Sequence, residues 1–307
     1  MTVTAQILAD SVDIYGNRIT TFELVYPRIV HSELMTHRVF SKNSASSRAI
    51  PVKRMNEIIR EDIARPIHFG QNQAGMQDAG EHFELINGYT PAEWWDLAIL
   101  SATKFSDAFD EAGYHKQVCN RLTEAGQHMK VVLTTTCIDN WFNLRNHEAA
   151  DPTIHMLALC MLEAYTESTP RVLHKDEWHM PYYGDGFWSE FKDGVDALGF
   201  TLKEALRISS SCCAQVSYRR LDDSLEKAND VFARLVESEP VHASPTEHQA
   251  TPIEVDEEYV HAVGFYEWPE GVTHLDKNGV LWSGNLKAWI QHRQLIPNHV
   301  CEKYDYQ

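Results

Sequence analysis

The sequence lacks the marks of a membrane, secreted or zinc-ribbon protein. Its 307 residues contain no apolar run of the roughly 18–20 residues needed to span a bilayer. The N-terminus, MTVTAQILADSVDIYG, has no basic region followed by an apolar segment and a cleavage site. Only six cysteines occur and none forms a CxxC pair, although Cys212 and Cys213 are adjacent. We therefore expect a cytoplasmic protein without a signal peptide, a disulfide framework or a structural metal.

Common catalytic signatures are also missing. The chain has no Walker A, GxGxxG, GxSxG or HExxH sequence, which argues against the usual nucleotide-binding folds, serine hydrolases and zinc proteases. Positive charge is scarce, with 27 Lys and Arg against 44 Asp and Glu, giving a formal net charge of −17. This balance disfavours general nucleic-acid binding but leaves room for a small anion at a local basic site.

One segment runs against the acidic balance. Between Leu34 and Asn56 there is no Asp or Glu, whereas five basic side chains stand there: Arg38, Lys42, Arg48, Lys53 and Arg54. Hydroxyl and amide groups lie among them: Ser41, Asn43, Ser44, Ser46 and Ser47. The segment is either a solvated basic loop or a phosphate cradle, in which Arg forks, hydroxyls and backbone N–H groups surround the anion.

Two more polar segments have both a structural and a functional interpretation. DNWFNLRNHEAADPTIH, from Asp139, concentrates Asn140, Asn143, Arg145 and His147 just before an apolar helix; it is either a polar helix end or a ligand site. EPVHASPTEHQATP offers His242, Glu247 and His248, but Pro245 interrupts the segment and no zinc-binding helix is present.

The expected secondary structure is mainly helical with a small, mostly antiparallel sheet, an α+β class. Residues 3–13 and 18–27 predict a hairpin that turns at Gly16. A helix starts at Thr90 as N-cap, with Glu93 completing a capping box and Gly113 near its end. Other helices are expected at about 28–40, 115–130, 134–147, 152–167, 201–216, 222–238 and 284–297. Residues 66–89 are turn-rich, 168–189 are expected to form a surface excursion, and 253–283 to be mostly irregular.

The basic segment carries a family resemblance. THRVFSKNSASSR, residues 36–48, resembles the signature of the flavin-dependent thymidylate synthases: Arg-His-Arg, seven residues, Ser, one residue and Arg. Five positions agree with that family: His37, Arg38, Asn43, Ser46 and Arg48. TTFELVYPRIVHSELM, upstream, is similar to the strand and helix that lead into the signature.

Three further matches lie later in the chain. Arg121 in QVCNRL is similar to an Arg that contacts the nucleotide. Asn140-Trp-Phe-Asn-Leu-Arg145 resembles the family's Asn-x-x-Asn-Leu-Arg, which is also followed by an apolar helix. Residues 212–252 resemble the family's N-terminal unit. That unit consists of an Ala-Arg-Val-Ser-Tyr-like turn, a helix and the sequence His-x-Ser/Thr-Pro-x-Glu-His. The positions of this last sequence are His242, Ser244, Pro245, Glu247 and His248 in this chain.

The order of these units differs from the family's, because the last unit normally precedes the Arg-His-Arg signature. The resemblance therefore implies a circularly permuted, insertion-bearing form, which folded chains tolerate when their termini lie close together. We expect a single domain over 1–307, built from 1–56, 90–167 and the permuted unit 201–250. Residues 60–90, 168–200 and 253–283 would be insertions.

The resemblance also implies an activity. That family transfers a one-carbon unit from methylenetetrahydrofolate to C5 of deoxyuridine monophosphate with FAD as cofactor, NADPH commonly reducing the flavin. No metal or cysteine nucleophile is required. By resemblance Arg145 is the catalytic residue. The nucleotide would be held by Arg48, Ser46, Ser44, Ser47, Arg121 and Glu33, and flavin or folate by His37, Arg38, Asn140, His242 and Ser244. The family's homotetramers imply an oligomer, with a nucleotide monophosphate and folate as partners, and no nucleic acid or membrane.

Departures from the family keep other functions open. Thr36 replaces Arg, Glu33 replaces Gln, Ser44 replaces Glu and Ala49 replaces Tyr. Thr134–Thr136 replaces an Asn-x-Arg flavin contact. A pyrimidine nucleotide C5 hydroxymethylase, a dCMP methylase, or a non-catalytic nucleotide-binding protein remain alternatives. Asn285, Lys287, Gln291 and Arg293 in the last expected helix are candidates to restore missing donors.

Overall fold

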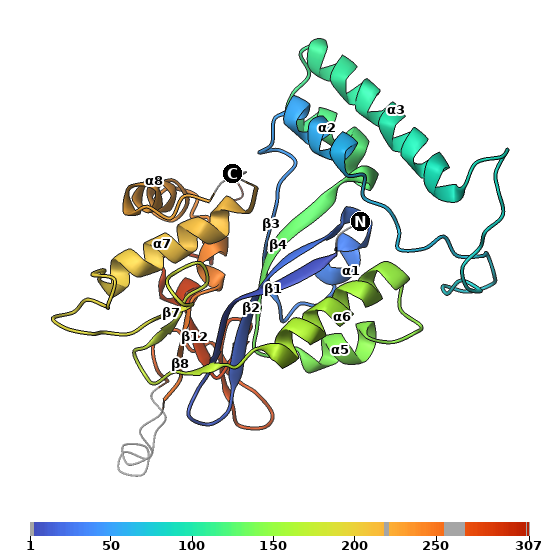
Figure 1. The fold of residues 1–307 in the computed structure, drawn as a ribbon. Coiled ribbons are helices and arrows are strands. Elements are labelled where there is room, and N and C mark those ends of the chain that lie inside the picture. Colours follow the sequence, from blue (N-terminus) through green and yellow to red (C-terminus); the bar gives the residue numbers. More distant parts are fainter. Residues whose placement is uncertain (1–2, 218–220, 255–267, 305, 307) are drawn as a thin grey trace.

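The computed structural model describes residues 3–217, 221–254, 268–304 and 306 (Figure 1). The described residues form helices and three small sheets, which confirms the α+β class. The predicted irregular segment 253–283 and the turn after Val216 fall partly on residues outside the described ranges. No helix of the described residues is long and apolar enough to cross a membrane.

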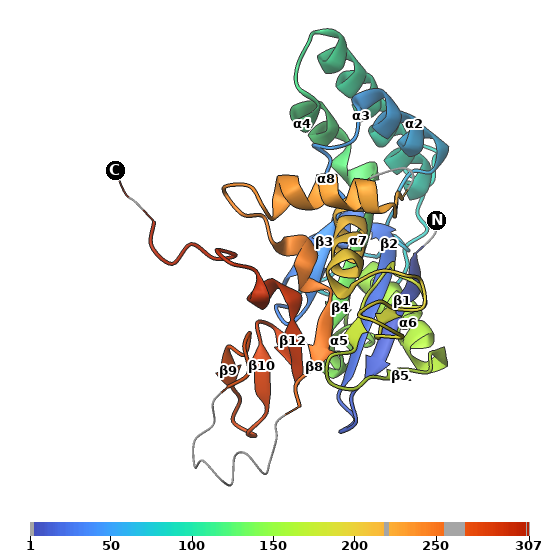
Figure 2. The same cartoon turned by 90° about the vertical axis from the view of Figure 1, so that its left-hand side faces the viewer.

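A five-stranded sheet, in the order β3-β4-β2-β1-β5, lies at the centre of the molecule (Figures 1 and 2). The neighbouring strands are antiparallel except for β5, which runs parallel to β1. The strands are β1 Thr4–Val12, β2 Arg18–Pro27, β3 Ser41–Ser44, β4 His128–Thr135 and β5 Arg171–Val172.

The predicted hairpin between β1 and β2 is present, and local chemistry explains it. The Asp13 carboxylate accepts hydrogen bonds from the backbone N–H groups of Tyr15 (2.9 Å) and Asn17 (2.7 Å). Gly16 takes a positive φ of 88°, which a side chain would disfavour. Local hydrogen bonds therefore close the turn, and the indole of Trp289 donates to the Asn17 carbonyl from the second half of the chain (3.2 Å).

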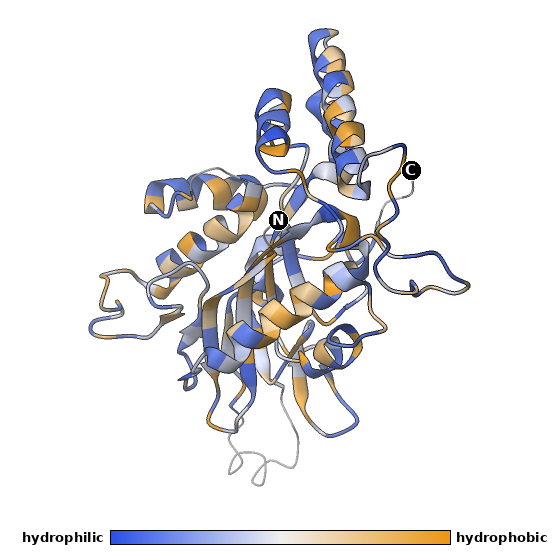
Figure 3. Cartoon of the chain, turned by 45° about the vertical axis from the view of Figure 1, so that its right-hand side comes forward, coloured by the Kyte–Doolittle hydropathy of each residue, from blue (hydrophilic) through white to orange (hydrophobic). Residues whose placement is uncertain are grey.

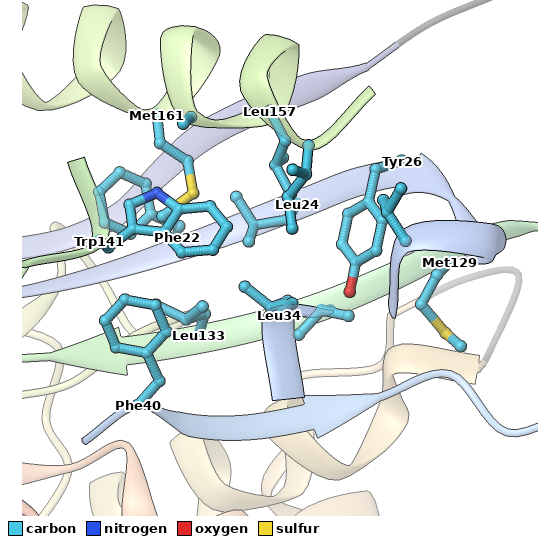
Figure 4. Close-up of a cluster of buried hydrophobic side chains, with 14 of the residues drawn as sticks. Phe22, Leu24, Tyr26, Leu34, Phe40, Met129, Leu133, Trp141, Leu157 and Met161 are labelled. Atoms are coloured by element: carbon cyan, nitrogen blue, oxygen red, sulfur yellow. The ribbon is translucent and has the colours of Figure 1, made fainter. Parts of the chain in front are cut away.

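Helices cover one face of this sheet and enclose the largest apolar core (Figure 4). Side chains of β2 and β4 meet those of α6 there, and Figure 4 shows Phe22, Leu24 and Leu133 facing Leu157 and Met161. The covering helices are α1 His31–Met35, α5 Asp139–Arg145 and α6 Pro152–Glu167, with the short 3₁₀ helix η1 Arg28–Val30 before α1. The predicted helix 152–167 is thus confirmed, with Asp151 as its N-cap.

The opposite face of the sheet is covered by the C-terminal half of the chain. Val132 of β4 packs against Cys213 and Val216 at the end of α7. The helices there are α7 Leu202–Ala214, η3 Gln215–Ser217, α8 Leu225–Leu235 and η4 Ser244–Glu247, which confirm the helices expected at 201–216 and 222–238. Beside them lies a four-stranded sheet with the order β12-β8-β6-β7. Its strands are β6 Trp178–His179, β7 Phe187–Trp188, β8 Ala250–Pro252 and β12 Trp289–Gln291.

The expectation that residues 168–189 form a surface excursion is wrong. This segment supplies fully or nearly fully buried side chains: Leu173, Trp178, His179, Met180, Tyr183 and Trp188. Its Pro, Gly and Tyr content is typical of loops, but these residues lie between α7 and the main sheet. The segment therefore belongs to the core of the second half.

Two helices expected from the sequence are strands. Residues 128–135 overlap the end of the helix expected over 115–130 and the start of the one expected over 134–147. They form β4 instead, because HMKVVLTT is rich in β-branched residues and both faces of the strand are buried. Residues 284–297 form β11 Leu286–Lys287, β12 and the 3₁₀ helix η5 His292–Leu295; Ala288 has a φ of 63°, which no α-helix contains. β11 pairs with β10 Leu281–Ser283, which pairs with β9 His274–Leu275.

A helical subdomain projects from one end of the main sheet (Figures 1 and 2). It contains α2 Val52–Glu61, α3 Pro91–Glu111, α4 Lys116–Cys119 and the 3₁₀ helix η2 Asn120–Gly126. Its own small apolar cluster is formed by Met55, Ile59, Ile63 and Ile99. The predicted capping box at Thr90 and Glu93 is present. The helix expected over 28–40 stops at Met35, and the Ser/Asn stretch after it begins as strand β3.

Candidate functional site

Arg145, the predicted catalytic residue, lies beside the start of the signature segment. Its guanidinium donates from Nε to His37 Nε2 (3.2 Å) and from Nη1 to Glu33 Oε2 (3.2 Å). Nη2 lies 3.5 Å from Thr36 Oγ1. The structure therefore joins two segments that are about a hundred residues apart in sequence, and fixes the guanidinium in three directions.

Burial of Trp141 explains this arrangement. Trp141 is fully buried in the main core, and Arg145 follows it by four residues on the same side of α5. The ring of His37 meets Trp141 edge-on at 4.8 Å and stacks on Phe40 at 5.6 Å. Trp141 thus holds both Arg145 and its acceptor His37.

Burial also sets the protonation of this cluster. It lowers the pKa of His37 to about 4, with Arg145 and Lys42 adding to the effect. A neutral His37 that accepts from Arg145 at Nε2 must carry its proton on Nδ1. Burial and Asp151 raise the pKa of Glu33, and Arg145 opposes this shift. The cluster therefore combines a fixed cation with a carboxylate and a neutral imidazole.

The predicted phosphate cradle forms a turn after the other end of β3. The backbone N–H of Arg48 donates to Ser46 Oγ (3.3 Å), and Ser46 N–H donates to Ser217 Oγ (2.7 Å). Asn120 Nδ2 donates to the carbonyl oxygens of Ser47 (2.7 Å) and Ile50 (2.9 Å). The turn is thereby fixed to η2, the element that carries Arg121.

The predicted basic ligands around this turn are exposed. Within the described ranges, none of Arg38, Arg48 and Arg121 forms a salt bridge, although the chain carries an excess of carboxylates. Ser47 is buried, and Ser44 faces Val131 in the β3–β4 ladder. Arg48 and Arg121 thus offer unpaired guanidinium groups on this turn and on the element fixed to it, as an anion site requires, whereas Arg38 lies at the other end of β3, next to His37.

A pocket of about 520 Å³ lies where the signature segment and α5 approach each other. Val39 lines it from the signature segment, Asn140 from α5 and Lys287 from β11. Thr135 and Thr136 contribute hydroxyl groups, and Lys287 N–H donates to Thr136 Oγ1 (2.8 Å). The volume is typical of a small-molecule site, and the lining is mainly polar.

The HASPTEH segment packs against the signature strand in the same chain. η4 contacts β3, and Gln291 Nε2 joins them by donating to Ser41 Oγ (3.2 Å) and to the Glu247 carbonyl (3.1 Å). Glu247 also forms a salt bridge with Arg293. Asn43 Nδ2 donates to the Cys213 carbonyl (3.3 Å). The HASPTEH segment and the signature strand, some 200 residues apart in sequence, are therefore neighbours in space.

His248 of this segment is part of a buried polar chain rather than an exposed ligand. Its Nδ1 lies 2.9 Å from Thr134 Oγ1, which lies 2.7 Å from Thr21 Oγ1. Thr21 Oγ1 lies 2.8 Å from Nε2 of His179, whose Nδ1 is 2.9 Å from Ser11 Oγ. Burial lowers the pKa values of His179 and His248 to about 3 each, so both rings are neutral. This series of hydrogen-bonded side chains connects the main sheet to the HASPTEH segment.

Comparisons with known proteins give only weak likenesses. No protein-family model matches the sequence. No curated protein matches it either. Among solved structures, the chain is similar to the UMP/dUMP methylase PolB from Streptomyces cacaoi bound with 5-Br UMP, at 14% identity and a TM-score of 0.44. That match covers 54% of this chain and 89% of PolB.

A second PolB structure, bound with 5-Br dUMP, gives a TM-score of 0.41 at 14% identity, covering 54% of this chain and 91% of that one. With TM-scores below 0.5, these likenesses assign no family. The functional argument therefore depends on the residues and their geometry.

The predicted site residues fall into separate groups. Glu33, His37 and Arg145 meet before β3, whereas Ser46, Ser47 and Arg48 lie after it, and a four-residue strand spans about 13 Å. Asn140 lines the pocket. His242 and Ser244 are exposed near η4, and in the described part of the chain neither side chain hydrogen-bonds to the other groups.

Sequence reasoning placed Asn285, Lys287, Gln291 and Arg293 on one helix. Asn285 lies instead in the turn between β10 and β11, Lys287 and Gln291 on short strands, and Arg293 in η5. Asn285 and Gln291 hydrogen-bond to Ser41, and Lys287 lines the pocket. Among the described residues, no group of three or more His, Cys, Asp or Glu could hold a metal ion. Burial raises the pKa values of five thiols, Cys212 to about 12 among them: Cys119, Cys137, Cys160, Cys212 and Cys213.

Proposed function

We propose that this protein is a flavin-dependent enzyme that transfers a one-carbon unit from methylenetetrahydrofolate to C5 of a deoxyuridine monophosphate. One observation carries the proposal: Arg145 of the NWFNLR segment is held by Glu33 and His37 of the signature segment. Two segments that resemble parts of one active site thus meet in space. The packing of the HASPTEH segment on β3 supports the same assignment and a permuted chain order.

Arg145 would activate the pyrimidine. C5 is a poor nucleophile until negative charge develops in the ring, and a fixed guanidinium beside the N3 and O2 edge stabilises that charge without reorganising. His37 and Glu33 are positioning residues here, because each binds the guanidinium from the protein side. The raised thiol pKa values support a mechanism without a cysteine nucleophile.

The pocket next to Asn140 fits part of a flavin in its chemistry, because it offers amide, hydroxyl and cationic groups from four elements. Asn140, His37, Arg38, His242 and Ser244 would hold flavin or folate in the assembled protein. Reduced FAD, when bound, supplies the hydride, and NADPH restores it. Arg48, Ser46 and Arg121 would hold the nucleotide phosphate.

The test is an assay of the purified protein with FAD, NADPH, methylenetetrahydrofolate and dUMP, with mass spectrometry of the nucleotide. We expect flavin binding, seen as an absorbance or fluorescence change on titration, and an enzyme-dependent product about 14 mass units heavier than dUMP, the mass of one added methylene. A protein that neither binds FAD nor alters any pyrimidine nucleotide would contradict the proposal.

A cytidylate substrate is the second candidate, and the Glu33–Arg145 pair favours it. Cytosine presents an amino donor at N4 beside acceptors at N3 and O2, and a carboxylate next to a guanidinium offers the complementary acceptor and donors. The same assay with dCMP in place of dUMP separates the two. The second candidate would be established if the wild type turns over dCMP faster than dUMP and the Glu33→Gln variant turns over dUMP faster than dCMP. A hydroxymethyl product, about 30 mass units heavier than the substrate, would indicate the related hydroxymethylase.

Arg48→Ala should raise the KM for the nucleotide about 10- to 100-fold with a smaller change in kcat, because a phosphate clamp contributes mostly uniform binding. Steady-state kinetics at varied nucleotide concentration measure this split. Lys53→Ala is a suitable control, since it removes a nearby cation to which no role is assigned.

Ser46→Ala should keep measurable activity, and a covalent adduct on Ser46 would overturn its assignment as a hydrogen-bonding ligand.

A further inference from the structure

Helix α3 carries an apolar face that its own chain leaves uncovered. Its inner face packs on α2 and η2 through Ile99, Thr103 and Ser106. Seven uncharged residues recur every three to four positions on the other side of the helix, with the exposed Lys104 at the edge of this stripe: Trp94, Leu97, Ala98, Ser101, Phe105, Ala108 and Phe109. All seven are exposed, Phe105 at 63%.

The arrangement of the subdomain leaves this face open to a partner. α3 is the outermost helix, with α2 between it and the sheets (Figures 1 and 2). Figure 3 shows hydrophobic residues recurring along its length. A surface helix normally has polar residues on its outer side, so a second apolar stripe needs an explanation.

The apolar surface continues beyond both ends of the helix. Trp94 donates from Nε1 to the Ile86 carbonyl (2.7 Å) and packs edge-on against Tyr89 at 5.9 Å. At the other end Phe109 lies 5.1 Å from the ring of Tyr114. The exposed members of the whole patch are Phe83, Leu85, Ile86, Tyr89, Trp94, Leu97, Phe105, Phe109 and Tyr114.

The size of the patch matches a stable interface. An aromatic side chain presents about 150–250 Å² when fully accessible. With the observed exposures, the patch amounts to roughly 900 Å², close to the ~800 Å² that each partner of a standard interface buries. Monomers rarely expose patches beyond about 300–600 Å².

We infer that this face is the two-fold interface between two copies of the chain, with their α3 helices antiparallel. Each copy has a formal net charge of −17, so two copies approach best at a face without carboxylates, and the seven residues of this stripe include none. The stripe is also self-complementary. With the two-fold axis near Ser101, Phe105 faces the partner's Ala98, and Phe109 faces the partner's Trp94, so large side chains meet small ones near the axis.

This inference is independent of the proposed enzymatic activity, because it uses only α3 and its surroundings. Light scattering after gel filtration of the full chain tests it. We expect an assembly of at least two copies at about 10 µM, and half that mass for Phe105→Glu, because each buried carboxylate would lose its hydration. Asp110→Lys, on the same helix and exposed on another side, is the matched control and should keep the wild-type mass.

A second variant tests the orientation of the helices. In a Cys301→Ser background, which removes the exposed native thiol, Ser101→Cys should form a covalent dimer on mild oxidation because two copies of residue 101 meet near the axis. Ala112→Cys, at the end of the helix and far from the axis, should not. Three results would each overturn the inference: a monomeric wild type, an unchanged mass for a folded Phe105→Glu variant, or no crosslink at position 101. A monomeric wild type would indicate that a different protein covers this face.

Discussion

Arg145→Lys should lower turnover at least 100-fold while leaving the fold intact. The guanidinium binds three acceptors at once, His37, Glu33 and Thr36, and still presents N–H groups outward. Lysine carries a point charge that cannot reproduce this planar set of donors. Loss of one fixed donor to a developing negative charge commonly costs about 10²–10³ in rate. Single-turnover or steady-state assays with saturating nucleotide measure the effect.

Arg28→Lys is the matched control for that experiment. The Arg28 side chain is 23% exposed and Arg145 21%, and Arg28 also pairs with one carboxylate, Glu124. It lies just before α1 and has no assigned role. Both variants should melt close to wild type and bind FAD alike. If Arg145→Lys turns over within about threefold of wild type, less than ~1 kcal/mol of barrier, Arg145 is not the activating residue.

Mild acid should destabilise the protein strongly, because buried histidines are held neutral, three of them in addition to His37. Burial lowers the pKa values of His179 and His248 to about 3 and that of His292 to about 4. In the unfolded chain each would titrate near 6.5. Between about pH 4 and 6.5 the unfolded state therefore binds more protons, so stability is complete above that range and falls as the pH falls.

The expected loss is about 1.3 kcal/mol for each histidine between pH 7 and 5.5, or roughly 4 kcal/mol for the three, a large part of a typical folding free energy. Urea unfolding at both pH values measures it. His179→Gln keeps donors and acceptors near Ser11 and Thr21 but cannot titrate, so the pH-dependent loss should shrink by one histidine's share, about 1.3 kcal/mol. His82→Gln, at a position that is not buried, is the control; the His82 side chain is 42% exposed. Equal stability at pH 7 and 5.5 would show that these rings accept protons within the native state.

Local chemistry made some of the fold predictable. The hairpin turn depends on Asp13 and Gly16, whose interactions lie within five residues. Helix α3 begins at the Thr90–Glu93 capping box, and α6 begins at Asp151 and Pro152. Such signals depend on residues that are neighbours in sequence, so they form in the same way whatever the tertiary structure around them.

The candidate site was predictable in its parts but not in its assembly. The residue types of the signature segment allowed an anion site, and the pyrimidine site was an expectation from the family resemblance. No sequence pattern indicated that Glu33 would pair with Arg145, because that contact depends on the burial of Trp141 against His37 and Phe40. Gln291 was placed on the wrong element, and its role in joining Ser41 to the HASPTEH segment follows from strand pairing between β12 and β8.

The sequence by itself determined the α+β class, the local turns and caps, and the basic segment in an acidic chain. Tertiary structure decided the rest. Residues 128–135 form the strand β4 because helices cover both faces of the main sheet there, and β-branched side chains pack well on both faces of such a strand. Residues 168–189 became core because their aromatic side chains fit between α7 and the sheet. Burial and strand pairing are properties of distant neighbours, so they overrode the local preferences from which these segments were predicted.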